Sequence, residues 1–233
     1  MLRVTGDINK MQAVHPLLPF MGVRFVVVDT ELTGLDEKAD SIVSIGAVRM
    51  TGGIIDIGDA FYQLINPETM LSASSVVIHE IMPSEVAAKP PIEAVLAEFL
   101  EFAGDNILLG HFISIDLAFL NREMKRIFNH EIRNSVLDTF SIYAWLSKRL
   151  KTRDCFATAP SGYRLYDIVK CFGIPVNGVH NAIADAYTTA QLMQRFFPLL
   201  TEVGIHNMGE LLKIGKPFNG GEQVRLTGEF GNF

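Results

Sequence analysis

The sequence has only two cysteines, Cys155 and Cys171, among its 233 residues. Neither has another Cys or a His nearby at the spacing of a zinc site. This scarcity excludes a small secreted scaffold that depends on disulfides for its stability. We interpret both cysteines as reduced thiols in the protein interior, and we therefore expect a cytoplasmic protein.

Positive charge is not in excess, and long apolar runs are missing. Lys and Arg number 20 against 26 Asp and Glu, which gives a net charge of −6. This balance argues against holding nucleic acid by bulk positive charge alone, but it leaves room for an enzyme whose acidic pocket is offset by cations. The apolar stretch MQAVHPLLPFMGV is interrupted by prolines and a histidine, and no run reaches the roughly 20 residues of a membrane span. We expect no membrane association.

The composition is otherwise that of a folded domain. Hydrophobic residues make up 48% and charged residues 20% of the chain, with no internal repeat and no low-complexity tract. The patterning is irregular over residues 1–20, dense over residues 21–200, and weak over residues 201–233. We therefore expect an N-terminal lead-in, one large domain, and a C-terminal tail of unknown role.

The order of the elements predicts an α/β fold. Three β-rich segments follow one another at 24–29, 41–50 and 54–66, with a glycine pair at 52–53 as a turn signal, and this order indicates an antiparallel meander. Helical periods then alternate with short strands. Strands are predicted at 106–111 and 135–138, and helices at 92–104, 115–128, 139–150, 163–173 and 181–197. The pattern predicts a mixed five-stranded sheet flanked by helices.

Two acidic residues come directly after the first predicted strand, in the stretch VVVDTELTGL. Asp29 and Glu31 lie two residues apart, so in an extended segment both side chains point to the same face. Two carboxylates on one face repel each other unless protons or metal ions neutralise them. Taken alone, the pair is better explained as two solvated residues just beyond the end of a strand.

Three further polar residues stand in apolar or small-residue surroundings near the starts of two predicted helices. Asp116 lies in GHFISIDLAFL, where a lone acid could simply complement the helix dipole. His180 and Asp185 lie in GVHNAIADA, where the small side chains around Asp185 leave room for a ligand. A histidine in such a position is often an ordinary capping residue. The joint pattern is more specific than any of its parts.

The motifs VVVDTELTGL, GHFISIDLAFL and HNAIADA, in this order, resemble the DEDDh, or DnaQ-like, 3′–5′ exonuclease superfamily. The resemblance covers about residues 23–197, and it is greatest to the proofreading (epsilon) subunit of bacterial DNA polymerase III and its stand-alone relatives. It implies a ribonuclease H-like fold and hydrolysis of phosphodiester bonds from the 3′ end of DNA, with release of nucleoside 5′-monophosphates.

The resemblance also implies a role for each acidic residue. Four carboxylates in one pocket require cations, and hard oxygen ligands select Mg²⁺ or Mn²⁺. Two ions about 4 Å apart can hold both reacting oxygens of a phosphodiester displacement. Asp29 would bridge the two ions, Glu31 and Asp185 would complete the site of the ion that holds the water, and Asp116 would serve the other ion. His180, with an ordinary pKa near 6.5, would be the catalytic general base.

The substrate-binding residues that the resemblance implies are Thr30, Leu32, Thr33, His79 and Phe112. Leu32 would pack on the terminal base, and His79 would lie near the terminal nucleotide, although a surface-loop histidine is an equal alternative.

The chain departs from the common family pattern at three positions. The family commonly has Thr, Asn and Gly where this chain has Leu32, Phe112 and Glu80. Phe112 would remove a polar contact near the scissile nucleotide, and Glu80 would add negative charge near an anionic ligand. The basic cluster SKRLKTR (147–153) would be either a phosphate-contacting patch or the solvated end of a helix.

Several alternatives stay open at the level of sequence. An exoribonuclease of the same fold would differ in contacts to the 2′-hydroxyl that the sequence does not place. An inactive nucleic-acid-binding module is disfavoured by the full set of four acids and a histidine. The partner we expect is the 3′ end of single-stranded nucleic acid, with DNA favoured over RNA. Action beside a polymerase and stand-alone action both fit, because no polymerase-binding motif is recognisable.

Overall fold

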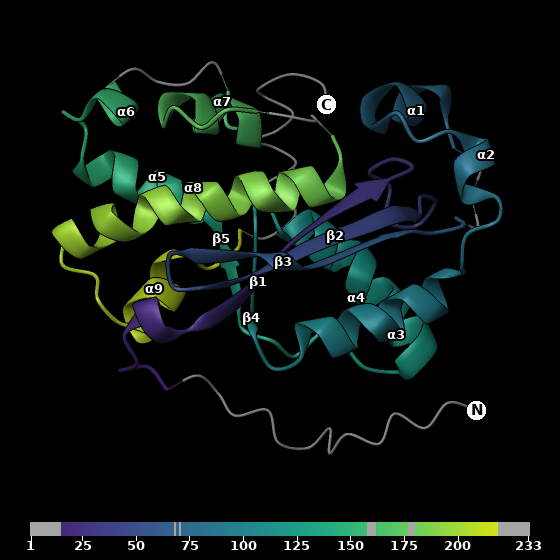
Figure 1. Cartoon of the computed structure of the whole chain (residues 1–233), viewed down its shortest axis with the longest axis horizontal. Coiled ribbons are helices and arrows are strands. Elements are labelled where there is room, and N and C mark those ends of the chain that lie inside the picture. The colour runs from purple at the N-terminus through teal and green to yellow at the C-terminus, as the bar shows by residue number, and fades with distance from the viewer. Residues whose placement is uncertain (1–14, 68, 70, 158–161, 177–179, 219–233) are drawn as a thin grey trace.

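The computed structural model describes residues 15–67, 69, 71–157, 162–176 and 180–218. Its centre is a five-stranded sheet with the strand order β3-β2-β1-β4-β5 (Figure 1). The strands are β1 (Arg24–Leu32), β2 (Ile42–Thr51), β3 (Ile54–Leu64), β4 (Ile107–Gly110) and β5 (Val136–Asp138). The first three pair antiparallel, and β4 and β5 run parallel to β1. The predicted mixed sheet and meander are therefore confirmed.

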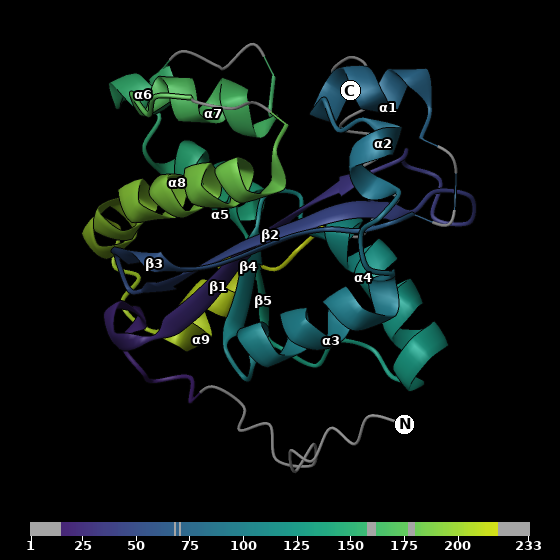
Figure 2. The same ribbon diagram turned by 45° about the vertical axis from the view of Figure 1, so that its right-hand side comes forward.

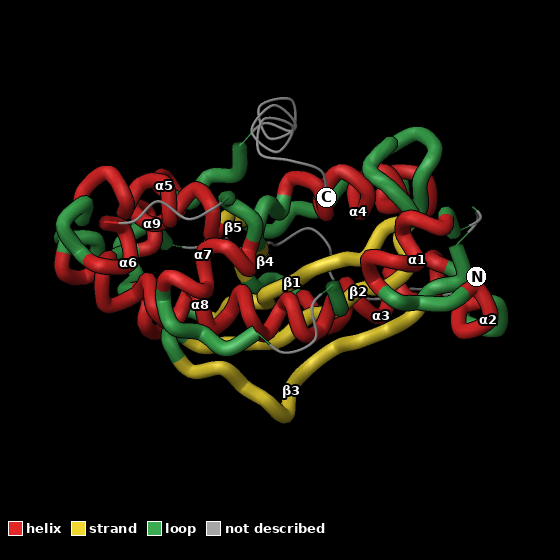
Figure 3. The backbone as a smooth tube through the Cα atoms, turned by 90° about the horizontal axis from the view of Figure 1, so that it is seen from above, coloured by secondary structure: helices red, strands yellow, loops and turns green. Residues whose placement is uncertain are grey.

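The sheet lies between two layers of helices (Figures 1 and 2). The helices are α1 (Ala73–His79), α2 (Pro83–Val86), α3 (Ile92–Ala103), α4 (Ser114–Phe128), α5 (Thr139–Arg149), α6 (Asp154–Ala157), α7 (Leu165–Cys171), α8 (Ala182–Glu202) and α9 (Met208–Ile214). Helices α5 and α8 cover one face of the sheet, and α3 and α4 cover the other. β3 forms one edge of the sheet (Figure 3).

Alternation along β1 divides the core between these two layers. Phe25 and Val27 belong to the hydrophobic cluster beneath α5 and α8, whereas Val26 and Val28 belong to the cluster beneath α3 and α4. All four side chains are at most 1% exposed. A strand that is buried on both faces has a continuous apolar run in its sequence, which here is FVVV at residues 25–28.

Helix α8 is the longest helix and lies close against the centre of the sheet. It packs through an apolar face, since Ala182, Ala186, Met193 and Phe197 are all buried. At its start, α8 approaches β2 so closely that a Cβ on Gly46 would lie 2.2 Å from the carbonyl carbon of Ala182. Such an approach is open only to glycine.

The sequence pattern predicts none of four short helices, α1, α2, α6 and α9. The last of these lies in the segment from residue 201 onward that we expected to be a tail. Instead, Asn207 caps α9 by accepting from the backbone N–H of Glu210, and Met208 and Leu211 are fully buried in the core beside α5 and α8. Two turns of helix are too short for a periodic signal, and their stability comes from packing.

Parts of the predicted lead-in and tail, residues 1–14 and 219–233, lie outside the described residues. Within the described part of the chain, no helix is both long and apolar enough to cross a membrane.

Candidate metal and catalytic site

A pocket of about 640 Å³ opens beside the carboxyl-terminal end of β1. All of the residues that the sequence predicted for the site line it: Asp29, Thr30, Glu31, Leu32, Thr33, His79, Phe112, Asp116, His180 and Asp185. They come from β1 and the loop after it, from α1, α4 and α8, and from the segments before α4 and α8. The fold thus brings together residues from distant parts of the sequence.

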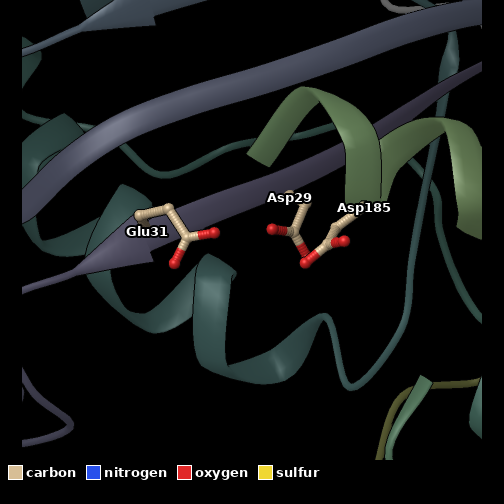
Figure 4. A group of neighbouring side chains, drawn as sticks. All are labelled: Asp29, Glu31 and Asp185. Carbon is tan, nitrogen blue, oxygen red and sulfur yellow. The ribbon is translucent and has the colours of Figure 1, made fainter. Parts of the chain in front are cut away.

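Three carboxylates form the densest group in this pocket. Asp29 and Glu31 from β1 and Asp185 from α8 each offer an oxygen atom, and these oxygens lie within 4.8 Å of one another. Figure 4 shows the three carboxylates directed into the same space between the strand and the helix. The pairing of Asp29 with Gly46 across β1 and β2 explains the approach, because the glycine lets the first turn of α8 come down beside Asp29.

The fourth acid, Asp116, is not one of this close group, and Thr30 holds it in place. Asp116 Oδ1 accepts both the backbone N–H of Thr30, at 2.9 Å, and the Thr30 hydroxyl, at 2.6 Å. β4 pairs with β1 only over Phe25–Val27, so Thr30 lies beyond the last contact between these two strands. Its N–H instead donates to the Asp116 carboxylate at the start of α4. The structure thus directs the Thr30 hydroxyl to Asp116, whereas the resemblance had implied contact with substrate.

The acids raise one another's affinity for protons. Burial raises the pKa of Asp29 well above its ordinary value, and the charges of its three neighbours raise it further. Burial, with the charges of Asp185 and Asp116, raises the pKa of Glu31 to about 8. Burial raises the pKa of Asp116 to about 7, against the hydrogen bonds from Thr30, and that of Asp185 to about 6. Such a site favours positive charge, and its donors are all hard carboxylate oxygens, so the residues fit divalent cations such as Mg²⁺ or Mn²⁺.

His180 stands at the entrance to α8 with a left-handed backbone, at φ = 57°. Its backbone N–H donates to the Tyr166 hydroxyl at 2.8 Å, and its ring contacts the Tyr166 ring edge-on. Burial and the charge of Arg164 lower the pKa of the imidazole. The ring is therefore neutral at neutral pH and able to accept a proton. Residues 177–179, which precede it, lie outside the described residues.

His79 is buried at the end of α1, only 5% exposed, and does not lie in a surface loop. Its Nδ1 accepts the backbone N–H of Ile81 at 3.0 Å, which places the ring proton on Nε2. Within the described part of the chain, Nε2 is buried without a hydrogen-bond partner. His79 lines the pocket, and its Nε2 is a buried donor that the described chain leaves unsatisfied.

The remaining predicted substrate residues differ in how accessible they are. Leu32 is partly exposed, whereas the Thr33 hydroxyl already donates to Asp40 and accepts from the backbone N–H of Ser41, both at 2.9 Å. Thr33 thereby anchors the loop that follows β1. Phe112 is 5% exposed and packs on Phe140 with ring centroids 4.5 Å apart.

Sequence reasoning missed six polar residues of the pocket lining: Ser75, His111, Arg164, Tyr166, Asp167 and Lys170. His111 bonds the Thr139 hydroxyl at 2.8 Å and the Tyr163 carbonyl at 2.9 Å, and burial lowers its pKa to about 4. Arg164, Tyr166, Asp167 and Lys170 lie on or just before α7, in a stretch that was predicted to be a helix and that resembles a segment of the family. Their facing partners could not be read from sequence. The basic cluster 147–153 does not line the pocket.

Comparison with known proteins places this geometry in context. The model of the RNase_T family, described as exonuclease, matches residues 26–193. DNA polymerase III subunit epsilon from Aquifex aeolicus is 35% identical over 179 residues, which cover 77% of this chain and 81% of that protein. DNA polymerase III PolC-type from Thermotoga maritima is 34% identical over 195 residues, which cover 84% of this chain but only 13% of that much longer protein.

Solved structures agree at the level of the fold. E. coli Exonuclease I in complex with a dT13 oligonucleotide superposes with a TM-score of 0.65 at 19% identity, over 78% of this chain and 42% of that one. Exonuclease X in complex with 5′ overhanging duplex DNA superposes with a TM-score of 0.58 at 24% identity, over 82% of this chain and 99% of that one. The ribonuclease H-like exonuclease fold implied by the motifs is therefore confirmed.

Proposed function

The chain belongs to the RNase_T family of exonucleases, and from that premise we propose a metal-dependent 3′–5′ exonuclease that acts on DNA for proofreading or repair. It would hydrolyse phosphodiester bonds at the 3′ end of a single strand and release nucleoside 5′-monophosphates. The observation that carries the proposal is the trio of Asp29, Glu31 and Asp185, whose oxygens lie within 4.8 Å in one pocket with Asp116 and His180.

The four acids would hold two divalent cations, Mg²⁺ or Mn²⁺. When bound, the cations supply the positive charge that stabilises the phosphate oxygens as charge develops on them. Asp29, Glu31 and Asp185 present oxygens to a common space, and Asp116 is oriented by Thr30. A dedicated orienting contact of this kind holds a ligand in the geometry that a metal requires.

His180 would act as the general base. Its lowered pKa leaves the ring neutral, so a ring nitrogen can take a proton from the attacking water as the water oxygen bonds to phosphorus. The bond from phosphorus to the 3′ oxygen of the preceding nucleotide then breaks. His79 lines the same pocket and would lie near the terminal nucleotide.

DNA is favoured as substrate because the relatives named above are DNA polymerase III components and the structural neighbours were solved with DNA. Cys155 and Cys171 are both free thiols, which supports the cytoplasm as the compartment.

The deciding experiment incubates the purified protein with 5′-labelled single-stranded DNA, and separately with RNA of the same sequence, in Mg²⁺, Mn²⁺ or EDTA. We expect a ladder that shortens from the 3′ end on DNA and is lost in EDTA and in Asp29→Asn. Asp56→Asn, in the exposed part of β3, is the matched control and should retain full activity. Faster degradation of RNA than of DNA would favour the exoribonuclease alternative. If neither strand is degraded, the proposed exonuclease activity is refuted.

A second variant tests the base. His180→Ala should lower kcat by about 100-fold or more, within the usual range for a general base, because the proton of the attacking water loses its acceptor. Stabilisation of the fold by Mg²⁺, measured by thermal unfolding, should be retained since no carboxylate is lost. Full activity of this variant in excess metal would refute the assignment of the base.

A further inference from the structure

The Tyr166 hydroxyl lies between two of the residues on which the proposed function rests. It hydrogen-bonds Asp185 Oδ1, and it lies 2.8 Å from the backbone nitrogen of His180. The Tyr166 and His180 rings also meet edge-on, with centroids 5.5 Å apart and an interplanar angle of 78°. One side chain on α7 therefore contacts both the proposed base and an acid of the trio.

The chemistry of the three groups fixes the direction of both hydrogen bonds. The backbone N–H of His180 can only donate, and an ionised Asp185 carboxylate can only accept. The hydroxyl has one proton and two lone pairs, so it accepts from His180 and donates to Asp185. The result is a directed chain from the His180 amide through the hydroxyl to the carboxylate, and each bond in such a chain polarises the next.

The backbone of His180 needs such support. Its φ of 57° lies in the left-handed region, which is unfavourable for a residue with a Cβ and persists only where the surroundings hold it. Asn181, the next residue, caps α8 by accepting from the Ala184 N–H. The Asn181 cap fixes the start of α8, and the Tyr166 hydroxyl holds His180, the residue just before the cap.

We propose that Tyr166 is a positioning residue whose hydroxyl sets His180 and Asp185 in a fixed relation to each other. The inference rests on the proposed function for its effect on catalysis. The two hydrogen bonds themselves belong to the metal-free, substrate-free protein, and they can be tested there.

The test compares Tyr166→Phe with Tyr187→Phe. Phenylalanine keeps the ring that packs on His180 and removes only the hydroxyl. Tyr187 is the matched control, because its hydroxyl also hydrogen-bonds the backbone, by donating to the Ile57 carbonyl at 2.9 Å, but it does not line the pocket. Two quantities are measured in each variant: hydrogen exchange of the His180 amide in EDTA, and kcat and KM on single-stranded DNA at saturating Mg²⁺.

In Tyr166→Phe we expect the His180 amide to exchange about 10-fold faster or more, because it loses its acceptor. We expect kcat to fall by about 10- to 100-fold, as is usual when a residue that orients a metal ligand is removed, while KM changes little. Tyr187→Phe should leave the exchange of the His180 amide, kcat and KM as in the parent. In a His180→Ala background, removing the Tyr166 hydroxyl should lower kcat by a much smaller factor, since the group it positions is gone.

Parent-like exchange and parent-like kcat in Tyr166→Phe would overturn the proposal. An equal loss of kcat with and without His180 would also overturn it, because the hydroxyl would then act through Asp185 alone. If the parent protein degrades no substrate, the proposed function fails. The exchange of the His180 amide would still decide whether Tyr166 holds that residue.

Discussion

Left-handed backbone conformations gather around the pocket. Four non-glycine residues in the described chain have positive φ: Glu80, Phe112, Asn129 and His180. Phe112 and His180 line the pocket, and Glu80 follows the lining residue His79. Such conformations are unfavourable for most side chains and concentrate where a site demands a particular backbone path. Phe112 is held by its N–H bond to Asp138 at 3.2 Å and by its ring packing on Phe140.

Glu80 gives a direct test of this cost. It ends α1 at φ = 58°, where its N–H donates to the Val76 carbonyl and glycine would be unstrained. Glu80→Gly removes a left-handed penalty of about 1–2 kcal/mol and adds an entropic cost of about 0.5–1 kcal/mol. We expect a net gain of about 0.5–1 kcal/mol, seen as a rise in Tm of about 1–4 °C.

The control for this change is Asn129→Gly, at φ = 59° at the end of α4, since asparagine already tolerates this conformation. Its effect on Tm should be smaller than that of Glu80→Gly. A lower Tm for Glu80→Gly would show that its side chain makes a stabilising contact that outweighs the strain.

At the scale of single residues, the sequence identified the site residues that belong to a motif. It did not identify contacts between residues that are far apart in the chain. The spacing of Asp29 and Glu31 was enough to place both on one face. Nothing in the sequence indicated that Thr30 would bond Asp116, or that Tyr166 would bond Asp185, because the fold alone brings those residues together.

At the scale of elements, the decisive contact is the docking of α8 on β2 at Gly46. A Cβ there would lie 2.2–2.5 Å from backbone atoms of Ala182 and Ile183, which cannot move aside as a flexible side chain could. Because Gly46 pairs with Asp29, the same contact sets the distance between Asp29 and Asp185. The packing of α8 on β2 therefore also determines the geometry of the candidate metal site.

We predict that Gly46→Ala displaces the start of α8. The overpacking should cost about 1–3 kcal/mol of stability, measured by urea unfolding. It should also lower kcat by up to about 100-fold, because the two carboxylates no longer meet correctly. Gly58→Ala in β3, where the nearest atom to a new Cβ is 3.7 Å away, is the control and should change neither quantity appreciably. A Gly46→Ala protein with parent activity would show that α8 can shift without moving Asp185.

Long elements were predictable, and so were the short elements β4, β5 and α7, but the other short helices were not. β1, β2, α3, α4 and α8 carry several periods of apolar patterning, and their positions matched the expectation to within a few residues. α1 and α9 are seven residues each, and α2 and α6 are four. A segment of that length is stabilised by what it packs against, which a sequence pattern does not contain.

For the whole molecule, the acidic pocket makes the free energy of unfolding depend on pH and on bound metal ions. Glu31 and Asp116 have pKa values raised to about 8 and about 7, well above the value of about 4 expected in the unfolded chain. The native state therefore binds more protons than the unfolded state up to about pH 8, and its stability falls as the pH rises through that range. His111, whose pKa is lowered to about 4, acts in the opposite direction, but only below its unfolded pKa of about 6.5.

We therefore expect the metal-free protein in EDTA to lose stability between pH 6.5 and pH 8.5. Thermal and urea unfolding measure this directly. Excess Mg²⁺ should raise stability more at pH 8.5 than at pH 6.5, because cations and protons compete for the same carboxylates. Glu31→Gln removes the group with the higher of the two raised pKa values and should flatten the slope in EDTA. Stability that rises with pH over this interval would contradict the assignment of raised pKa values to the pocket.

The close trio unites the first strand of the sheet with the last long helix, since Asp29 and Glu31 come from β1 and Asp185 from α8. During synthesis, β1 leaves the ribosome before α8, so Asp29 and Glu31 have to wait for Asp185. A nascent chain that stops before α8 carries Asp29, Glu31 and Asp116 but lacks Asp185, and its set of metal ligands is incomplete. Because Asp185 comes so late in the sequence, any nuclease activity has to wait until nearly all of the described fold has been synthesised.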